Sequence, residues 1–552
     1  MSNLLLPPDE FYDSSSSVRS SYEFRESFDI DDADYAAESE LLGYGNKPYF
    51  LLYRERDPLV SRFISSVPLR LRYLSLRRVG YYLHVLLGFV AALIVFTFLF
   101  RPSYSRPPPH YRTLQHAIQQ SQAPGRGNPH NEKVFIAINL YDKGGSLARG
   151  KWGQAVLELI DLLGEDNTYL SIYENDSGYE AEHALWEFDK QVKCNSSVVF
   201  ERHYDFTDTP EVTLGDGSVR KRRIPYLAEL RNKVLQPLDG ELDMKFDRVL
   251  YLNDVYFNPI DAVQLLFSTN TGLDGRPHYR AACAVDFGNL LKFYDSFAVR
   301  DSHGYPIGVP FFPWFTSAGH ATSRRDVLDE KDAVRVRSCW GGITAFDAKY
   351  LQQPKKTITE DETRLPFLHS GLADRRIYTS PEWRKAKNNG KPLRFRAISD
   401  MYWEASESCL IHADIQEPYS NIDDIIDTGV YMNPYIRVSY DYTAFTWLGF
   451  VRRFERLFTI PNWIANTVSG HPAHNSRRTD IAGKTVEQRV WKANTSHTDG
   501  GYWTSQKRIA PPGSFCARRD LFVLISDRKE GEDGWEPINV PRDPDSKDWI
   551  QP

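Results

Sequence analysis

Residues 79–100 constrain this chain more than any other segment. The run holds twenty-two residues, and His84 is its only strongly polar side chain. A helix rises about 1.5 Å per residue, so the run covers a bilayer's hydrocarbon core of about 30 Å. A soluble helix of this length would show a polar stripe, and a cleaved signal peptide would begin near residue 1. The sequence therefore predicts one membrane-spanning helix.

Arginines are denser before this helix than after it. Five arginines precede the helix, namely Arg62, Arg70, Arg72, Arg77 and Arg78. Three follow it, namely Arg101, Arg106 and Arg112. The more basic side faces the cytoplasm under the positive-inside rule. We expect a single-pass type II protein of the Golgi membrane, with residues 101–552 in the lumen.

Two further features fit a lumenal location. Acceptor sequons for N-glycosylation begin at Asn175, Asn195 and Asn494, all after the helix. The five cysteines also follow it, and disulfides persist in such a compartment. Leaving one cysteine out gives five choices times three pairings, so about fifteen patterns stay open. These cysteines are Cys194, Cys283, Cys339, Cys409 and Cys516.

Length and composition indicate a globular body with appendages. The chain has 552 residues, 41% of them hydrophobic, which is enough for a large core. A formal charge of −6 gives no basic surface, so we expect no nucleic-acid partner. The predicted order is a disordered cytoplasmic tail (1–78), the membrane helix (79–100), a Pro- and Gln-rich stem (101–131), a catalytic domain (132–420) and a C-terminal extension packed on it (421–552).

Strand-like and helix-like segments alternate after the stem. Buried-strand patterns cover 134–140, 169–173 and 248–252, and helical spacing covers 152–163 and 226–238. This alternation predicts an α/β domain, related to the Rossmann fold, with a mainly parallel sheet. Ligands of such sheets bind beyond the carboxyl ends of the strands. The polar residues at those ends are Asn139 with Asp142, Glu174 with Asp176, and Asn253 with Asp254.

Asp254 is the candidate ligand of a divalent cation. A carboxylate at a strand tip offers the oxygen ligand that hard cations prefer, and such a cation offsets the charge of a departing diphosphate. The alternative is that Asn253 and Asp254 only cap the following helix or form a turn.

Three later blocks also carry chemistry. Asp286, with Asp295 and Asp301 after it, is expected to orient an acceptor hydroxyl or line a sugar pocket; for Asp295 and Asp301 the alternative is solvated surface. Trp340-Gly341-Gly342 offers a stacking face beside an accessible backbone, which suits a sugar. His412 follows an expected short apolar strand and is either a core histidine or a late metal ligand.

Several strings together resemble the fungal α-1,3-mannosyltransferase family that includes the cryptococcal capsule-associated proteins. They are VFIAINLYD, YLSIYENDS, YLAELRN, FDRVLYLNDVYF, AACAVDFGNLLKFYDSFAVRD, CWGGITAFDA, LPFLHS and SESCLIHADIQEP, between residues 133 and 418. The resemblance implies a lumenal domain of the GT-A type and GDP-mannose as donor. It also implies Mn2+ or Mg2+, a mannose-bearing glycan acceptor and retention of anomeric configuration.

The resemblance assigns roles to matching positions. Asn253-Asp254-Val255 stands where many GT-A enzymes carry an Asp-x-Asp triplet, and Val255 departs from that pattern, which leaves Asp254 and His412 as metal ligands. The other assignments are donor-binding Asn139, Glu174, Glu229, Arg231, Asn232 and Asn253, acceptor-binding Trp340, Gly341 and Gly342, and candidate catalytic carboxylates Asp286, Glu404 and Glu407.

Other functions stay open at this stage. One is transfer of a different sugar, since no motif reads the donor. Another is an inactive, membrane-anchored glycan-binding protein, and a third is a glycoside hydrolase that uses two carboxylates.

Overall fold

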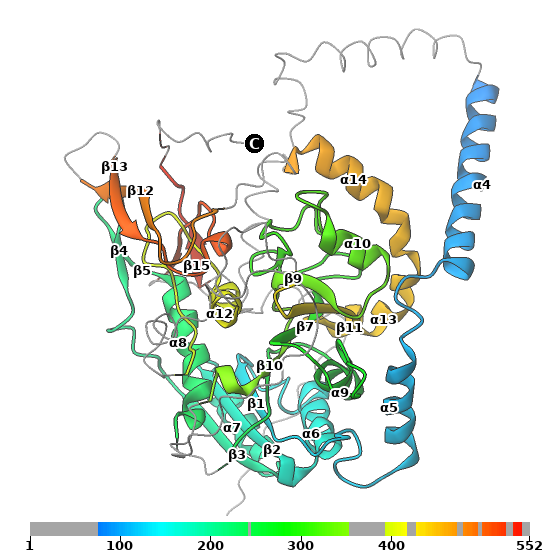
Figure 1. Ribbon diagram of the computed structural model, residues 1–552, viewed down its shortest axis with the longest axis horizontal. Coiled ribbons are helices and arrows are strands. Elements are labelled where there is room, and N and C mark those ends of the chain that lie inside the picture. The colour runs from blue at the N-terminus through cyan, green and yellow to red at the C-terminus, as the bar shows by residue number, and fades with distance from the viewer. Residues whose placement is uncertain are drawn as a thin grey trace, which may run out of the picture.

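The computed structural model describes residues 76–240, 244–352, 392–416, 427–471, 478–494, 500–525, 534–541 and 543. The predicted tail lies outside the described residues up to position 75, and so does the string LPFLHS. The predicted apolar helix is confirmed as α4 (Leu76–Phe100). Its segment Gly80–Phe100 is long and apolar enough to cross a membrane, and it stands at one side of the body, apart from the central sheet (Figure 1).

A nine-stranded, mostly parallel sheet forms the centre of the body (Figure 1). Two strands, β10 and β9, run antiparallel to their neighbours, and the other seven share one direction. In sheet order the strands are β3 (Asn195–Glu201), β2 (Thr168–Asn175), β1 (Val134–Leu140), β6 (Arg248–Leu252), β10 (Ile343–Asp347), β7 (Ala281–Phe287), β11 (Val430–Ser439), β9 (Val334–Ser338) and β8 (Arg300–Asp301).

Helices cover both faces of this sheet because its inner strands are apolar on both sides. Strands β1 and β6 are buried along their whole length. One face carries α6 (Lys151–Leu163), α9 (Pro259–Ser268) and α5 (Pro109–Gln120); the other carries α8 (Arg223–Leu235) and α12 (Glu407–Ile415). Two more helices are α7 (Tyr179–Asp189) and α10 (Thr322–Leu328).

The expected boundary at residue 420 cuts through the sheet. β11 lies beyond it, yet pairs in parallel with β7 and antiparallel with β9. All ten residues of β11 are buried. The sheet domain therefore continues to at least Ser439.

The expected stem is also part of the body. Within residues 101–131, α5 buries Tyr111, Leu114 and Ile118. The Tyr111 hydroxyl accepts a 2.6 Å hydrogen bond from the side chain of Asn433 on β11. Tyr104 is fully buried only four residues after α4 ends. The segment thus packs on the sheet domain instead of spacing it away from α4.

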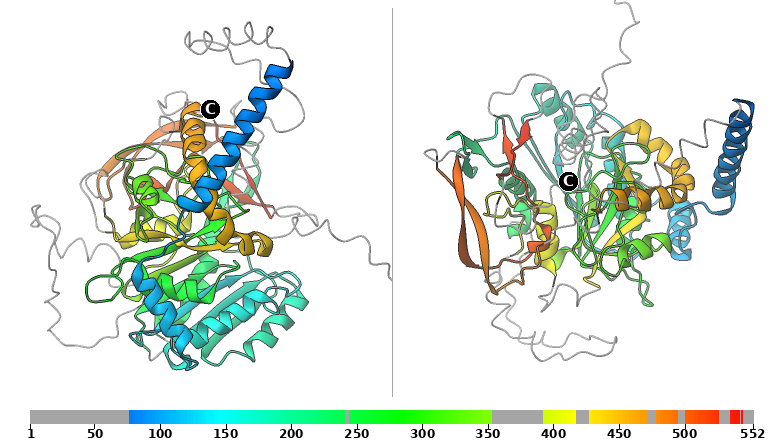
Figure 2. Two further views of the ribbon diagram at one scale, coloured as in Figure 1. Left: turned by 90° about the vertical axis from the view of Figure 1, so that its right-hand side faces the viewer. Right: turned by 90° about the horizontal axis from the view of Figure 1, so that it is seen from above.

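The C-terminal part surrounds two sides of this body. α13 (Tyr442–Val451), the 3-10 helix η4 (Arg452–Phe458) and α14 (Thr459–Val468) lie beside α4, and the hairpin of β12 (Thr485–Ala493) and β13 (Gly501–Ile509) lies on the far side (Figure 2). Short elements complete it: β4 (Glu211–Thr213), β5 (Val219–Lys221), η5 (Ser514–Cys516), β14 (Phe522–Leu524) and β15 (Trp535–Pro537).

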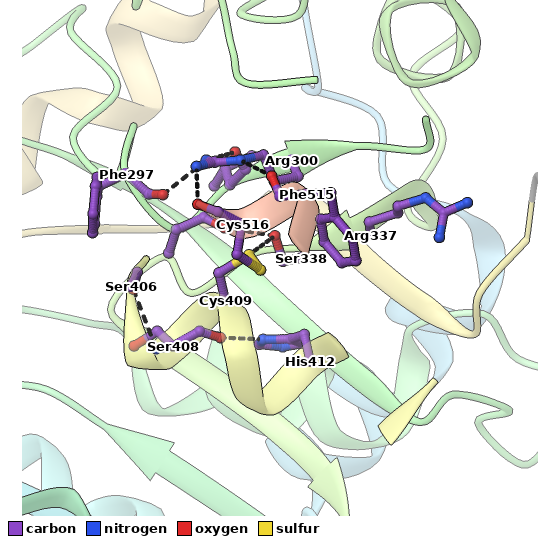
Figure 3. Close-up of a disulfide and its surroundings, with 12 residues drawn as sticks. Phe297, Arg300, Arg337, Ser338, Ser406, Ser408, Cys409, His412, Phe515 and Cys516 are labelled. Carbon is purple, nitrogen blue, oxygen red and sulfur yellow. Dashed lines mark hydrogen bonds between the residues drawn. A yellow bond between two sulfur atoms is a disulfide. The ribbon is translucent and has the colours of Figure 1, made fainter. Parts of the chain in front are cut away.

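Two disulfides resolve the cysteine pattern. Cys283 pairs with Cys339 beneath the turn that follows β9, and Cys194 stays a buried free thiol. Cys409 on α12 pairs with Cys516 on η5, which ties the C-terminal part to the sheet domain (Figure 3). Buried Arg300 strengthens this tie, since its guanidinium donates to the backbone oxygens of residues 515 and 516 at 3.1 and 2.7 Å.

Candidate active site at the carboxyl edge of the sheet

Four predicted site residues from separate segments meet beside the carboxyl end of β6. Arg231 of α8 donates to the carboxylate of Glu407 at 2.7 Å and to the Asn253 side-chain oxygen at 3.4 Å. Trp340 donates its indole N–H to that same oxygen at 3.2 Å. The structure thus joins two donor-site predictions, one acceptor-site prediction and one catalytic prediction in a single cluster.

The Arg231 guanidinium is held from several directions. The side chains of Arg231 and Glu407 are 2% and 3% exposed, so both charges are almost fully removed from water. The guanidinium also lies 4.3 Å from the centre of the Trp340 ring, a cation–π arrangement that desolvation strengthens. Trp340 is itself buried, and its ring supports Arg231. The structure therefore gives no support to the sugar-stacking role expected for this side chain.

Gly341 and Gly342 form a tight turn whose backbone only glycine fits. Their φ angles are +56° and +67°, in the left-handed region. A Cβ on Gly341 would lie 2.0 Å from the Ala284 carbonyl oxygen, and one on Gly342 would lie 2.8 Å from Val255. The Gly342 carbonyl accepts a 2.9 Å hydrogen bond from the Asn253 amide. Close protein packing therefore already accounts for both glycines.

Three buried carboxylates surround this turn. Asp254 follows Asn253 directly and is fully buried, and Asp286 near the end of β7 is buried as well. Asp295 accepts from the Gly341 amide at 3.4 Å, and Asp286 accepts from the Asp295 amide at 3.2 Å. Burial rules out the solvated alternative for Asp295, and likewise for Asp301. Carboxylates at this edge are the oxygen ligands that Mn2+ or Mg2+ prefers.

His412 is fully buried, and the short strand expected before it is not formed. Its segment is helix α12 and not a strand. Its Nδ1 lies 2.6 Å from the Ser408 carbonyl, as Figure 3 shows, and its ring packs 5.4 Å from that of Phe346. Phe346 is in register with Val249 of β6, five residues before Asp254, or about 16 Å along the strand. The structure therefore gives no support to His412 as a ligand beside Asp254.

The surroundings of His412 are those of a core histidine. Burial lowers its pKa to about 4, so the ring is neutral at pH 7. Its Nε2 lies 3.8 Å from the sulfur of Cys283. Within the described part of the chain, Cys283, Cys339 and His412 are the one group of three potential metal-binding side chains in close contact. The two cysteines form a disulfide, so they are not thiolate ligands.

Glu404 pairs with a different arginine from the one that pairs with Glu407. Its carboxylate accepts a 2.8 Å hydrogen bond from Arg222, which directly precedes α8. Arg222 lies nine residues before Arg231, or about 13 Å along the helix. Burial raises the pKa of Glu404 to about 7, although Arg222 opposes that shift. The structure thus places Glu404 in a buried ion pair outside the Asn253 cluster.

Asn139 and Asn232 hold structural elements together. Asn139 donates to the Leu230 carbonyl of α8 at 3.0 Å and accepts from the Tyr251 hydroxyl. Asn232 donates to and accepts from the backbone of Phe395, both at 2.8 Å. These bonds use the amide groups inside the protein, so the structure gives no support to the donor-facing roles expected for these two residues.

The remaining donor-site predictions lie at the end of β2 and on α8. Glu174 is buried and accepts from the Asp142 amide at 3.2 Å. Burial raises the pKa of Glu174 to about 8, and the nearby Asp142 carboxylate adds to this shift. Glu174 is therefore protonated near pH 7 and can donate a hydrogen bond. Glu229 is half-buried beside Tyr204. Burial of the Tyr204 hydroxyl and the nearby Glu229 carboxylate both raise the pKa of Tyr204.

One of the three expected glycosylation sites is not accessible. Asn175 is 4% exposed, and its side-chain nitrogen donates to the Tyr226 hydroxyl at 3.0 Å and to Asp176 at 2.6 Å. No space is left there for a glycan in the folded protein. Asn195 and Asn494 are exposed, and they remain predicted acceptors.

Two aromatic residues of the cluster were not among the predicted site residues. Trp152 at the start of α6 donates to the Asn253 carbonyl at 3.4 Å, and the Tyr440 hydroxyl accepts from the Asn253 side chain at 3.3 Å. Every polar group of Asn253 is thus engaged. Tyr440 directly follows β11, so the polar residue at a strand end is the signal that would have identified it.

The fold is an α/β sheet domain with buried carboxylates at the carboxyl edge of its sheet, where ligands of such sheets bind. A family model described as "Cryptococcal mannosyltransferase 1" matches residues 133–414, just over half of the chain. The chain therefore belongs to this mannosyltransferase family, which confirms the resemblance seen in the sequence. It is a glycosyltransferase.

Curated proteins and solved structures give no further functional assignment for this chain. No curated protein matches the chain. One similar solved structure is the mannosyltransferase PcManGT from Pyrobaculum calidifontis in complex with GDP-Man and Mn2+, at 10% identity over 65% of this chain and 71% of that one. The TM-score is 0.27, so we transfer no residue or ligand from it.

Proposed function

We propose that this protein is an α-1,3-mannosyltransferase that moves mannose from GDP-mannose to a mannose-bearing glycan with retention of configuration. The observation that carries the proposal is the pair of buried carboxylates Asp286 and Asp295 at the Gly341-Gly342 turn, with buried Asp254 next to Asn253, whose amide bonds that turn, inside the segment that matches the family. The strand order, with β10 antiparallel between β6 and β7, supports a GT-A type of fold.

α4 and the disulfides support a location in the secretory pathway. The helix is long and apolar enough to span a membrane, and the arginine excess precedes it. Both disulfides lie after it and would persist in the secretory pathway. We therefore propose a single-pass type II protein of the Golgi membrane with a lumenal body.

Asp254 is the residue we propose to hold Mn2+ or Mg2+. It supplies a carboxylate at the strand tip, and the neighbouring Asp286 and Asp295 keep the edge negative, so the residues present suit a hard cation. When bound, the cation offsets the charge that develops on the diphosphate leaving group. Asn253, fixed by Arg231 and Trp340, sets the position of Asp254.

Among the three candidate catalytic carboxylates we favour Asp286. Glu404 and Glu407 each neutralise a buried arginine, so releasing either would leave an uncompensated charge. Asp286 instead lies with Asp295 at the turn, where it can stabilise positive charge on the transferred sugar. We assign Glu407 a positioning role through Arg231.

The test is GDP release from GDP-mannose by the full-length protein in detergent, with Mn2+ or chelator and with mannose-containing acceptors. We expect acceptor-stimulated, Mn2+-dependent release that Asp254→Asn abolishes without lowering the thermal midpoint. Asp216→Asn, in an exposed turn, is the matched control and should keep wild-type release.

Each other result decides against part of the proposal. Full activity of Asp254→Asn would exclude Asp254 as the metal ligand. Release from a different nucleotide-sugar only would replace the donor. Glycan binding by the folded protein without any turnover would favour an inactive membrane-anchored glycan-binding protein.

A further inference from the structure

The α13–η4–α14 segment (residues 442–468) exposes a row of large apolar side chains beside α4. Six of them are Trp447, Phe450, Ile460, Trp463, Ile464 and Val468, which are 48–83% exposed. Soluble proteins rarely leave so many large apolar side chains together on their surface. We name this surface, defined by these six residues, the apolar face.

α14 has its polar side turned inward. Asn462 and Asn466 are 2% and 4% exposed, and they bond the 308–311 loop through contacts such as the 2.8 Å bond from Asn462 to the Phe311 carbonyl. Ile460, Trp463, Ile464 and Val468 point outward instead. None of the ten residues of α14 is charged. This arrangement is the reverse of a water-facing helix and fits an apolar environment outside the protein.

The apolar face is continuous with the membrane helix. Phe98, in the last turn of α4, packs on Phe450 and Phe454 with ring centroids 5.8 and 5.3 Å apart. The Arg453 guanidinium lies 4.9 Å from the Phe98 ring, where it can reach lipid phosphates. Figure 2 shows α13 and α14 on the side of the body that faces α4.

The body cannot move far from the bilayer. Tyr104, four residues after α4 ends, is fully buried and donates to the Val327 carbonyl at 3.1 Å. Four extended residues span about 14 Å at most. The packed α5 then follows, so no flexible stem separates the body from the end of α4.

We infer that the apolar face is a second membrane contact, which lies in the interface of the leaflet that α4 leaves at Phe100. Helices with an outward apolar side and tryptophans lie in such interfaces, with their apolar side chains among the upper acyl chains. Together with α4 this contact would hold the catalytic body in one orientation on the bilayer. The inference rests on the membrane span and not on the enzymatic activity.

The test uses full-length protein in phosphatidylcholine vesicles, with the photoreactive residue p-benzoyl-phenylalanine at position 447 or 463. Position 502 is the matched control, since Tyr502 is 44% exposed and lies on β13, on the far side from α4 (Figure 2). Each change replaces one exposed aromatic with another, and GDP release or the thermal midpoint reports folding.

We expect several-fold more lipid adduct at 447 and 463 than at 502. Equal labelling at all three positions would overturn the inference. Cross-links that double the chain mass at 447 or 463, without lipid adducts, would also overturn it and would assign the apolar face to contact between two copies.

Discussion

Removing one partner of the Arg231–Glu407 pair tests the centre of the site most directly. Both side chains are almost fully buried and 2.7 Å apart, and losing one partner of such a pair costs roughly 3–5 kcal/mol because the other charge is left uncompensated. Arg231→Met also removes the contact with Trp340, which is worth about 2 kcal/mol when desolvated. We therefore expect Glu407→Gln and Arg231→Met each to lower the stability of the body by several kcal/mol, Arg231→Met the more.

The double variant separates this pairing from simple loss of packing. With both charges gone nothing is left uncompensated, so the double variant should be more stable than the sum of the single losses predicts, by about 3 kcal/mol. Thermal unfolding of the full-length protein, followed by circular dichroism, measures the four proteins. Glu182→Gln is the control, because its pair with Arg202 is on the surface and should change nothing measurable. Additive losses, or an unchanged midpoint in Glu407→Gln, would refute the reasoning.

Three further outcomes can be measured. Glu174 has a folded-state pKa of about 8 against 4.5 as its ordinary value, so its contribution to stability is lost as pH rises through this window. The thermal midpoint of the wild type should therefore fall more between pH 5 and 9 than that of Glu174→Gln, and parallel curves would disprove this. Gly341→Ala should prevent folding or activity because its Cβ would meet the backbone of β7, whereas Gly178→Ala, in open space at φ 88° and ψ 172°, should cost only the backbone strain of roughly 1–3 kcal/mol. Cys516→Ser opens a loop of 107 residues and should destabilise the protein by roughly 4–5 kcal/mol, with faster proteolysis of the C-terminal part as the readout; unchanged proteolysis would contradict the tie through Cys409.

The elements predicted correctly are those with a strong local pattern. The apolar run became α4, and the strands expected at 134–140 and 248–252 have those bounds in the structure. The Pro-rich stretch after α4 and the strand β11 were misjudged, since α5 is fixed by burial against α9 and β11 by pairing with β7 and β9. Such long-range contacts leave little trace in local composition.

For the site as well, the sequence predicted individual residues but not the contacts between distant segments. Arg231, Asn253, Trp340 and Glu407 were all expected to be functional, and the structure joins them. Their contacts with one another depend on four segments far apart in the sequence, so no spacing rule could reveal them. His412 misled because a short apolar run fits a strand or a buried helix equally well.

The charge balance of the assembled site gives a physical reason for the proposed cation. Within the part of the chain that the structure describes, the carboxyl groups of Asp254, Asp286, Asp295 and Glu407 belong to the segments that meet at the Gly341-Gly342 turn and Asn253, and Arg231 contributes a guanidinium there. Glu407 already neutralises that guanidinium at 2.7 Å, so Arg231 cannot offset a diphosphate as well. A diphosphate would add further negative charge to an edge that is acidic and largely desolvated. We therefore expect donor binding at this edge to depend on a divalent cation, so that chelation weakens GDP binding itself as well as turnover.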